Sequence, residues 1–352
     1  MVAQFSWAQQ SAKYSYSLAA EVSKGFIYRN HEYVGHLIKG KPIGIELSLQ
    51  QKTFGAKAWE ANYGYPEVDF KLSYYDLKNK EQLGHVIAIS TGMAFHLLGS
   101  ASSKNSLQFY FGMGIAYATN PYNKETNNLN NVISSRLSYN GNLKLAYHHN
   151  FGSRINTGIG VKVTHYSNGS AKLPNIGLNL VSLNLMTSVR ISNGTPEHIA
   201  APEQDINKKI RYGVVLRMGW AESSPAGSGV KPVYGLSFIV QKRVSLKSLI
   251  EIGIDGFANK AIEYEIQNGF NEDASLDYKR VGFMFGHELV VNKLTLVTQM
   301  GIYLYKPYYP EERLYTRLGL NYYVTDNVFL GFSLKTHFAV AEVIEYSIGF
   351  RL

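Results

Sequence analysis

Short segments in which apolar and polar residues alternate recur along the whole of this 352-residue chain. Val68, Phe70 and Leu72 share one parity, and the intervening Asp69 and Lys71 share the other. Successive side chains of a β-strand point to opposite faces, so this period of two predicts strands with one apolar and one polar face.

Sixteen segments follow this pattern, and most of them exceed the ~9–11 residues with which a tilted strand crosses a bilayer. No window holds the ~18 or more uninterrupted apolar residues of a membrane helix, so only strands are expected to span a membrane. The predicted strands are 14–25, 42–53, 66–76, 83–98, 105–118, 135–150, 153–167, 177–192, 209–222, 230–243, 246–258, 276–291, 293–306, 311–325, 327–339 and 341–352.

The connections between these segments tend to alternate in length, as they do in outer-membrane barrels, whose periplasmic turns are short and whose extracellular loops are long. An even number of strands places both termini on the periplasmic side. Two connections depart from the pattern, because 54–65 and 193–208 would both be long on that side. The fold class predicted is an all-β, antiparallel, transmembrane outer-membrane β-barrel of about 16 strands.

Residues 193–208 divide the chain into two similar halves, each of which ends in a hairpin with a Thr-His pair, Thr164-His165 and Thr336-His337. This indicates an internal duplication. One closed sixteen-strand barrel and two tandem eight-strand barrels both fit. The single barrel is favoured, because an open edge in lipid leaves backbone groups unpaired. The expected segments are 1–13, an N-terminal periplasmic segment, 14–192 and 209–352, the barrel halves, and 193–208, a linker.

Composition supports a barrel, since 26 Tyr, 17 Phe and 32 Gly accompany only 17% charged residues. The net charge of +9 favours anionic partners such as lipid head groups. Its scattered distribution argues against nucleic acid. The absence of cysteine excludes disulfides and thiol chemistry. The N-terminus has neither the basic nor the apolar region of a secretory signal, so we expect a mature outer-membrane sequence whose signal has been removed.

Three polar residues interrupt the apolar face of the predicted hairpin 153–192. His165 and Ser167 have the parity of the apolar residues before them, and Asn179 has the parity of those on the returning strand. All three are therefore expected to face lipid near the extracellular end. That position is costly for polar groups without a function, because lipid supplies no hydrogen-bond partners.

This arrangement is suited to acyl transfer on a lipid ester. A serine two residues from a histidine can lose its proton to the imidazole during attack, and the oxygen of an Asn side chain can orient the ring. Asn168 and Gly169 are the candidate oxyanion donors. Neither a cofactor nor a metal is implied. The alternative is structural: His165 and Ser167 bind head groups, and the other residues shape the turn.

The pattern His165-x-Ser167-Asn168 followed by Pro174-Asn175-x-Gly177 resembles the lipid A 3-O-deacylase family, also called PagL-like or acyloxyacyl-hydrolase-like proteins. The resemblance covers about 20–192 and is similar to longer, Bacteroidetes-type members. It implies that His165 is the base, that Ser167 is the nucleophile, and that lipid A or lipopolysaccharide is the substrate. The family's acidic residue on the next strand falls on Asn179, which departs from the pattern.

The other histidines are not assigned to a catalytic or metal site. His337 shares its parity with Ser333 and Lys335 and is expected in the lumen as a structural residue paired with a carboxylate. His31, His36 and the pair His148-His149 show no metal-ligand spacing.

Two functions therefore remain open. The first is a lipid A deacylase-like esterase that acts on lipid A, lipopolysaccharide or another outer-leaflet lipid. The second is a catalytically inactive barrel that serves as a scaffold or as a subunit of an outer-membrane complex. The amide at Asn179 favours the second, and the lipid-facing Ser/His pair favours the first.

Overall fold

The computed structural model describes residues 13–268, 275–308, 312–338 and 340–352. The predicted periplasmic segment 1–13 lies outside this part of the chain except for its last residue. Two compact units are present, and each is described by itself. The first comprises 1–121, 136–166 and 178–202, and the second comprises 122–135, 167–177 and 203–352.

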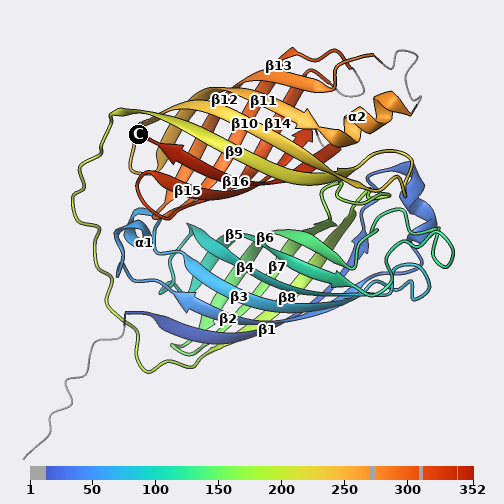
Figure 1. Ribbon diagram of the computed structural model, residues 1–352. Coiled ribbons are helices and arrows are strands. Elements are labelled where there is room, and N and C mark those ends of the chain that lie inside the picture. The colour runs from blue at the N-terminus through green and yellow to red at the C-terminus, as the bar shows by residue number, and fades with distance from the viewer. Residues whose placement is uncertain (1–12, 269–274, 309–311, 339) are drawn as a thin grey trace, which may run out of the picture. The chain divides into compact units, whose positions relative to one another are not determined.

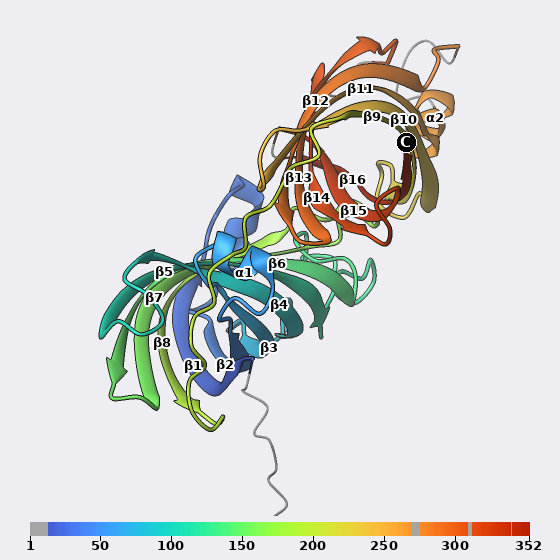
Figure 2. The same ribbon diagram turned by 90° about the vertical axis from the view of Figure 1, so that its left-hand side faces the viewer.

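Eight antiparallel strands close into the first barrel (Figures 1 and 2). Each strand pairs with the next in sequence, and β1 pairs with β8 to complete the ring. The strands are β1 (Ser15–Ile27), β2 (Ile43–Lys52), β3 (Glu67–Asp76), β4 (His85–Leu98), β5 (Asn105–Ala118), β6 (Leu137–Phe151), β7 (Ile155–Ser167) and β8 (Leu178–Arg190).

The second barrel repeats this order, with β16 paired to β9. Its strands are β9 (Ile210–Glu222), β10 (Val230–Arg243), β11 (Ser248–Asn259), β12 (Lys279–Val291), β13 (Leu294–Tyr305), β14 (Leu314–Tyr323), β15 (Val328–His337) and β16 (Val340–Arg351).

The all-β class, the sixteen strands and the two eight-strand halves are confirmed, and every strand end lies within three residues of its expected position. Of the two arrangements that the sequence left open, the structure has the tandem barrels, so the preference for a single barrel was wrong. In each half the last strand pairs with the first, so the backbone groups of both edge strands are hydrogen-bonded. Neither half then needs the other to close its sheet.

Alternation along each strand separates an apolar exterior from a polar interior. On β1, Leu18 and Val22 are 54% and 53% exposed, whereas Glu21 and Ser23 are 5% and 4% exposed. Exposed apolar side chains continue around both barrels. A bilayer is the solvent that suits such an exterior.

The interior of the first barrel contains buried ion pairs. Lys162 contacts Glu46 and lies 3.3 Å from Glu21, and Lys144 lies 2.7 Å from Glu21. Buried charges of opposite sign compensate for one another's lost hydration. These buried side chains fill part of the lumen.

The second barrel uses a comparable cluster with arginine in place of lysine. Arg317 lies 3.2 Å from Asp255 and 2.6 Å from Glu345. Buried aromatic residues, among them Phe257 and Tyr315, join the apolar part of its core. Both lumens are therefore packed cores rather than open pores.

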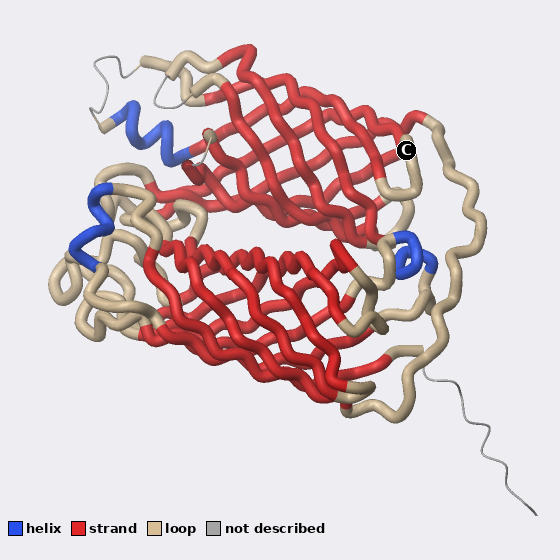
Figure 3. Tube along the Cα trace, turned by 180° about the vertical axis from the view of Figure 1, so that it is seen from behind, coloured by secondary structure: helices blue, strands red, loops and turns tan. Residues whose placement is uncertain are grey.

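Helices are short and lie in the connections (Figure 3). They are η1 (Glu32–Leu37), α1 (Ala58–Asn62) and α2 (Lys260–Gln267). No helix among the described residues has both the length and the apolar character needed to cross a membrane.

The two connections that departed from the expected lengths have separate explanations. Residues 193–208 join one barrel to the next and are therefore not a turn within a single barrel. Residues 54–65 contain α1, and the backbone N–H of Ile199 donates to the carbonyl oxygen of Phe54 at 2.8 Å. The start of the linker thus packs on the connection between β2 and β3.

Candidate active site on the β7–β8 hairpin

His165 and Asn179 face each other across the pairing of β7 with β8. The register places His165 opposite Asn179. The Nδ1 atom of His165 and the Oδ1 atom of Asn179 are 2.7 Å apart. His165 is exposed and Asn179 is half-buried, whereas their neighbours Thr164 and Leu180 are buried. The pair therefore lies on the outer face of the barrel.

This contact decides which tautomer of His165 is favoured. The Oδ1 atom of an asparagine accepts hydrogen bonds only, so Nδ1 of the imidazole must donate. In the neutral ring the other nitrogen, Nε2, is then unprotonated and can accept a proton. A general base needs this state of the ring.

Ser167 ends β7 and has the same parity as His165. Two residues along a strand span roughly 7 Å, and alternation gives both side chains the same face of β7. The Oγ atom of Ser167 accepts from the backbone N–H of Gly169 at 3.1 Å and from Nδ2 of Asn175 at 2.8 Å. Two donors therefore point at the hydroxyl oxygen of Ser167, whereas the negative charge of a tetrahedral intermediate would develop on the carbonyl oxygen of the substrate.

The side chain of Asn168 is engaged elsewhere in the turn. It is buried, and its Nδ2 atom donates to the hydroxyls of Ser134 and Ser135 and to the carbonyl oxygen of Lys172, at 2.9 to 3.0 Å. Its backbone N–H donates to Oδ1 of Asn175 at 3.3 Å. Of the two expected oxyanion donors, Gly169 directs its N–H at Ser167, and Asn168 instead binds the loop that precedes β6.

Residues 167–177 belong to the second unit, where their backbone is held by Glu222 at the end of β9. Glu222 accepts from the backbone N–H of Leu173 at 2.6 Å, and its own N–H donates to the carbonyl oxygen of Ser170 at 3.0 Å. The Oγ atom of Ser170 donates to the carbonyl oxygen of Ala341 at 2.7 Å. The turn that carries Ser167 is therefore fixed at several points.

Sequence reasoning did not assign Asn175 or Glu222 to the site. Asn175 belongs to the motif Pro174-Asn175-x-Gly177 and follows Ser167 by eight residues in the same turn. That spacing is the signal that could have indicated a contact across the turn. Glu222 is 49 residues from Leu173 along the chain, and no local signal connects them.

The second Thr-His pair does not reproduce the site. His337 is buried in the second barrel, where its Nε2 atom lies 3.0 Å from the hydroxyl of Tyr303 and 3.6 Å from a carboxylate oxygen of Glu342. The expectation of a lumenal histidine near a carboxylate matches this geometry. The hairpins of the two halves thus present their histidines to opposite faces.

Solved structures are similar to this chain only at low sequence identity and low TM-score. The outer-membrane enzyme PagL is 16% identical with a TM-score of 0.32, and 48% of this chain and 97% of that chain are covered. Neisserial surface protein A is 8% identical with a TM-score of 0.32, at coverages of 51% and 99%. Omp33 of Acinetobacter baumannii is 9% identical with a TM-score of 0.19, at coverages of 96% and 99%. At these values no conclusion about this chain rests on the structural likeness.

No curated protein is significantly similar to this chain in sequence. Family models, in contrast, match both halves. The model described as lipid A 3-O-deacylase (PagL) matches residues 43–188, and the model described as acyloxyacyl hydrolase, C-terminal domain, matches residues 210–352. The first match includes His165, Ser167 and Asn179, and the second covers every strand of the second barrel. The chain belongs to the lipid A 3-O-deacylase (PagL) and acyloxyacyl hydrolase family.

Proposed function

We propose that this protein is an esterase that removes an ester-linked acyl chain from lipid A or a related outer-leaflet lipid. Ser167 is the nucleophile, His165 is the general base and then the general acid, and Asn179 orients His165. The observation that carries the proposal is the 2.7 Å contact between His165 and Asn179 on the outer face of the barrel, two residues from Ser167.

The protein lies in the outer membrane, in accord with its family and with two barrels whose exteriors are apolar. A serine and a histidine on the outer surface of such a barrel meet lipid rather than water-soluble substrates. This location supports a lipid as the substrate of the proposed reaction.

The reaction proceeds in two steps. The Oγ atom of Ser167 attacks the acyl carbonyl while Nε2 of His165 takes its proton, and the imidazolium then protonates the leaving lipid alcohol. Water, deprotonated by His165, attacks the acyl-enzyme ester and releases the fatty acid. Before the reaction, the backbone N–H of Gly169 and the side-chain amide of Asn175 both donate to the Oγ atom of Ser167.

A groove on the same outer face suits an acyl chain. Its volume is about 650 Å³, and its apolar lining includes Phe26, Val161 and Leu183 from β1, β7 and β8. Val181, which also lines it, is the next outward-facing residue after Asn179 on β8. In the proposal, an acyl chain lies in this groove and its ester reaches the hairpin, while Lys24 and Lys41 at the groove provide positive charge for lipid phosphates.

One observation favours the second function, a scaffold or a subunit of an outer-membrane complex. The amide of Asn179 carries no charge, so it stabilises an imidazolium less than a carboxylate does. The hydrogen bond nevertheless holds the ring in the tautomer that catalysis needs, and for that reason we place the esterase first.

The proposal is tested by mass spectrometry of lipid A after incubation with the purified protein in detergent. The native chain is expected to remove one acyl chain, and Ser167→Ala and His165→Ala are each expected to reduce the rate by at least about 10³-fold. Thr336→Ala is the matched control, because it changes a hydroxyl residue of the corresponding hairpin in the other barrel.

Heat-dependent migration of the folded barrels on gels checks that each variant folds. Deacylation that persists in folded Ser167→Ala would rule out this nucleophile. Intact lipid A with every variant, under conditions in which a related deacylase is active, would instead favour the scaffold.

A further inference from the structure

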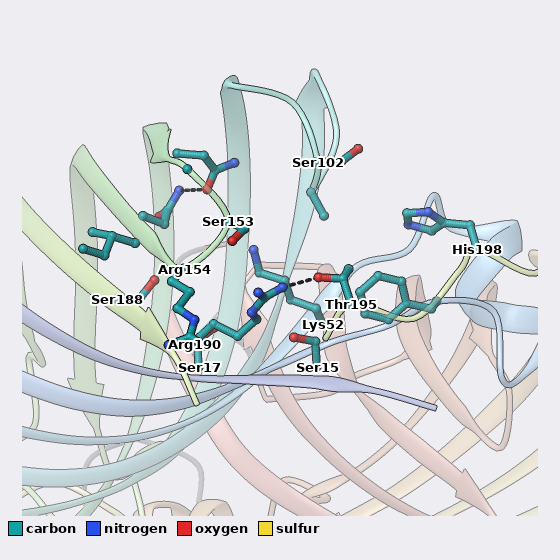
Figure 4. A pocket seen from close by; sticks show the side chains of 16 residues that line it. Ser15, Ser17, Lys52, Ser102, Ser153, Arg154, Ser188, Arg190, Thr195 and His198 are labelled. Carbon is teal, nitrogen blue, oxygen red and sulfur yellow. Dashed lines mark hydrogen bonds between the residues drawn. The ribbon is translucent and has the colours of Figure 1, made fainter. Parts of the chain in front are cut away.

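A polar cavity lies in the first unit, at the strand ends opposite to the β7–β8 hairpin tip. Its volume is about 290 Å³. Ser15 and Ser17 at the start of β1, Lys52 at the end of β2, and Arg190 at the end of β8 line it (Figure 4). The first strand of the barrel begins and its last strand ends here, and in an outer-membrane barrel that end faces the periplasm.

Positive charge is concentrated in this cavity. Lys52, Arg154 and Arg190 are among the sixteen residues that line it, and none of the sixteen is Asp or Glu. Lys52 lies 3.6 Å from Glu67, a carboxylate outside the lining. Within the part of the chain that the structure describes, the two arginines have no acidic partner. Six hydroxyl groups accompany them, on Ser15, Ser17, Ser102, Ser153, Ser188 and Thr195.

Arg190 is only partly satisfied within the described residues. One terminal nitrogen, Nη1, donates to the hydroxyl of Thr195, and the buried Nε has no partner there (Figure 4). A buried N–H without an acceptor costs free energy, and an anion with several oxygens would supply the acceptor.

The linker forms one wall of the cavity and is held in place. Phe54 and His198, which both line the cavity, have ring centroids 5.0 Å apart. Gly55 has a φ of +91°, and a Cβ at this position would lie 2.0 Å from the carbonyl oxygen of Ile199. Only glycine permits this approach of the linker to the connection after β2.

We propose that this cavity binds a phosphate monoester group. Guanidinium groups hold phosphate oxygens in pairs, and hydroxyl groups donate to the remaining oxygens. A phosphate monoester has three terminal oxygens and close to two negative charges at neutral pH, which suits two arginines and several hydroxyls better than a carboxylate does. The volume equals that of roughly ten liquid waters, so it also accommodates a glycerol or sugar attached to the phosphate.

Calorimetric titration of the full-length protein in a non-ionic detergent and a phosphate-free buffer tests this. The probes are inorganic phosphate and glycerol 1-phosphate, with acetate for comparison. We expect saturable binding of at least one phosphate probe with a stoichiometry of about one, and much weaker binding of acetate. Tighter binding of glycerol 1-phosphate would indicate a lipid head group or a sugar phosphate as the source, and equal binding would indicate free phosphate.

Arg190→Gln and Arg154→Gln are each expected to weaken this binding at least about tenfold, as loss of one charged hydrogen-bonding group does. Arg154→Gln guards against misfolding, because its side chain is exposed. The matched control is Arg136→Gln, which removes the same charge from an exposed position before β6, at the other end of this barrel.

Absence of saturable binding by the native chain would overturn the proposal. Equal affinity for acetate, or an equal loss in Arg136→Gln, would do the same, because each would indicate general charge attraction. Ser167→Ala is expected to bind the probes as the native chain does, so this test is independent of the esterase.

Discussion

At the scale of single residues, the central feature of the site is an amide where the family pattern has an acid. Asn179 accepts from His165 at 2.7 Å, and the same contact would be available to a carboxylate of the same length. In the proposed mechanism, Asn179 thus orients the His165 ring without stabilising the charge of the imidazolium.

Asn179→Asp is expected to increase kcat for lipid A deacylation at least about tenfold, since the carboxylate would retain the contact and stabilise the imidazolium. Asn179→Leu is expected to lower kcat about 100-fold, because the ring would lose its orienting partner. Rates measured by mass spectrometry at saturating lipid A give both values.

Retention of native kcat by Asn179→Leu would contradict the orienting role. Asn105→Asp is the control for a carboxylate added beside a histidine of this barrel, because Oδ1 of the exposed Asn105 lies 2.7 Å from Nδ1 of His149, and it should not increase the rate. Both positions carry an Asn, so the chemical change is identical.

At the scale of the strands, apolar and polar residues alternate, so one face of each strand is apolar and faces lipid, and the other faces a packed interior. The interior positions carry charges because a narrow eight-strand lumen must be filled, and paired charges of opposite sign fill it without leaving an uncompensated one. Lys162 illustrates this, because it contacts two carboxylates, those of Glu46 and Glu21.

Lys162→Met is expected to reduce the free energy of unfolding by about 3–5 kcal/mol, because two buried carboxylates would lose a shared partner. Lys24→Met, on the exposed face of β1, should change it by less than about 0.5 kcal/mol. Urea unfolding in lipid vesicles, followed by tryptophan fluorescence, measures both. Equal effects of the two substitutions would show that the lumenal ion pairs do not determine stability.

At the scale of the whole molecule, the chain closes two rings rather than one. The pairing of β1 with β8 and of β9 with β16 leaves each barrel without an edge strand. The linker crosses from one closed sheet to the next and contributes no strand to either. Each barrel therefore has its own complete set of backbone hydrogen bonds.

Cutting the linker should for this reason leave both barrels folded. A specific protease site placed within 203–208 is expected to yield two fragments, each of which migrates faster on a gel before heating than after it. An identical site inserted in the β12–β13 turn, at Asn292-Lys293, provides a control cut within one barrel. Unfolding of either fragment after linker cleavage would show that the barrels depend on covalent continuity.

Much of this architecture was predictable because strand periodicity is local. The alternation of Val68, Phe70 and Leu72 with Asp69 and Lys71 determined both the strand and its two faces. The same parity placed His165 outside and His337 inside, as the structure has them. For the site, sequence provided the polar residues on the hairpin, although their catalytic roles remain a proposal.

Only the tertiary structure decided which strands close each ring, because alternation states which face a strand buries and not which strand it pairs with. It also decided that Asn175, rather than the side chain of Asn168, donates to Ser167, since turn geometry directs each amide. The same holds for the contact of Glu222 with Leu173, which lie 49 residues apart along the chain. It holds as well for the cavity around Arg190, because barrel closure and the path of the linker bring its parts together from distant segments.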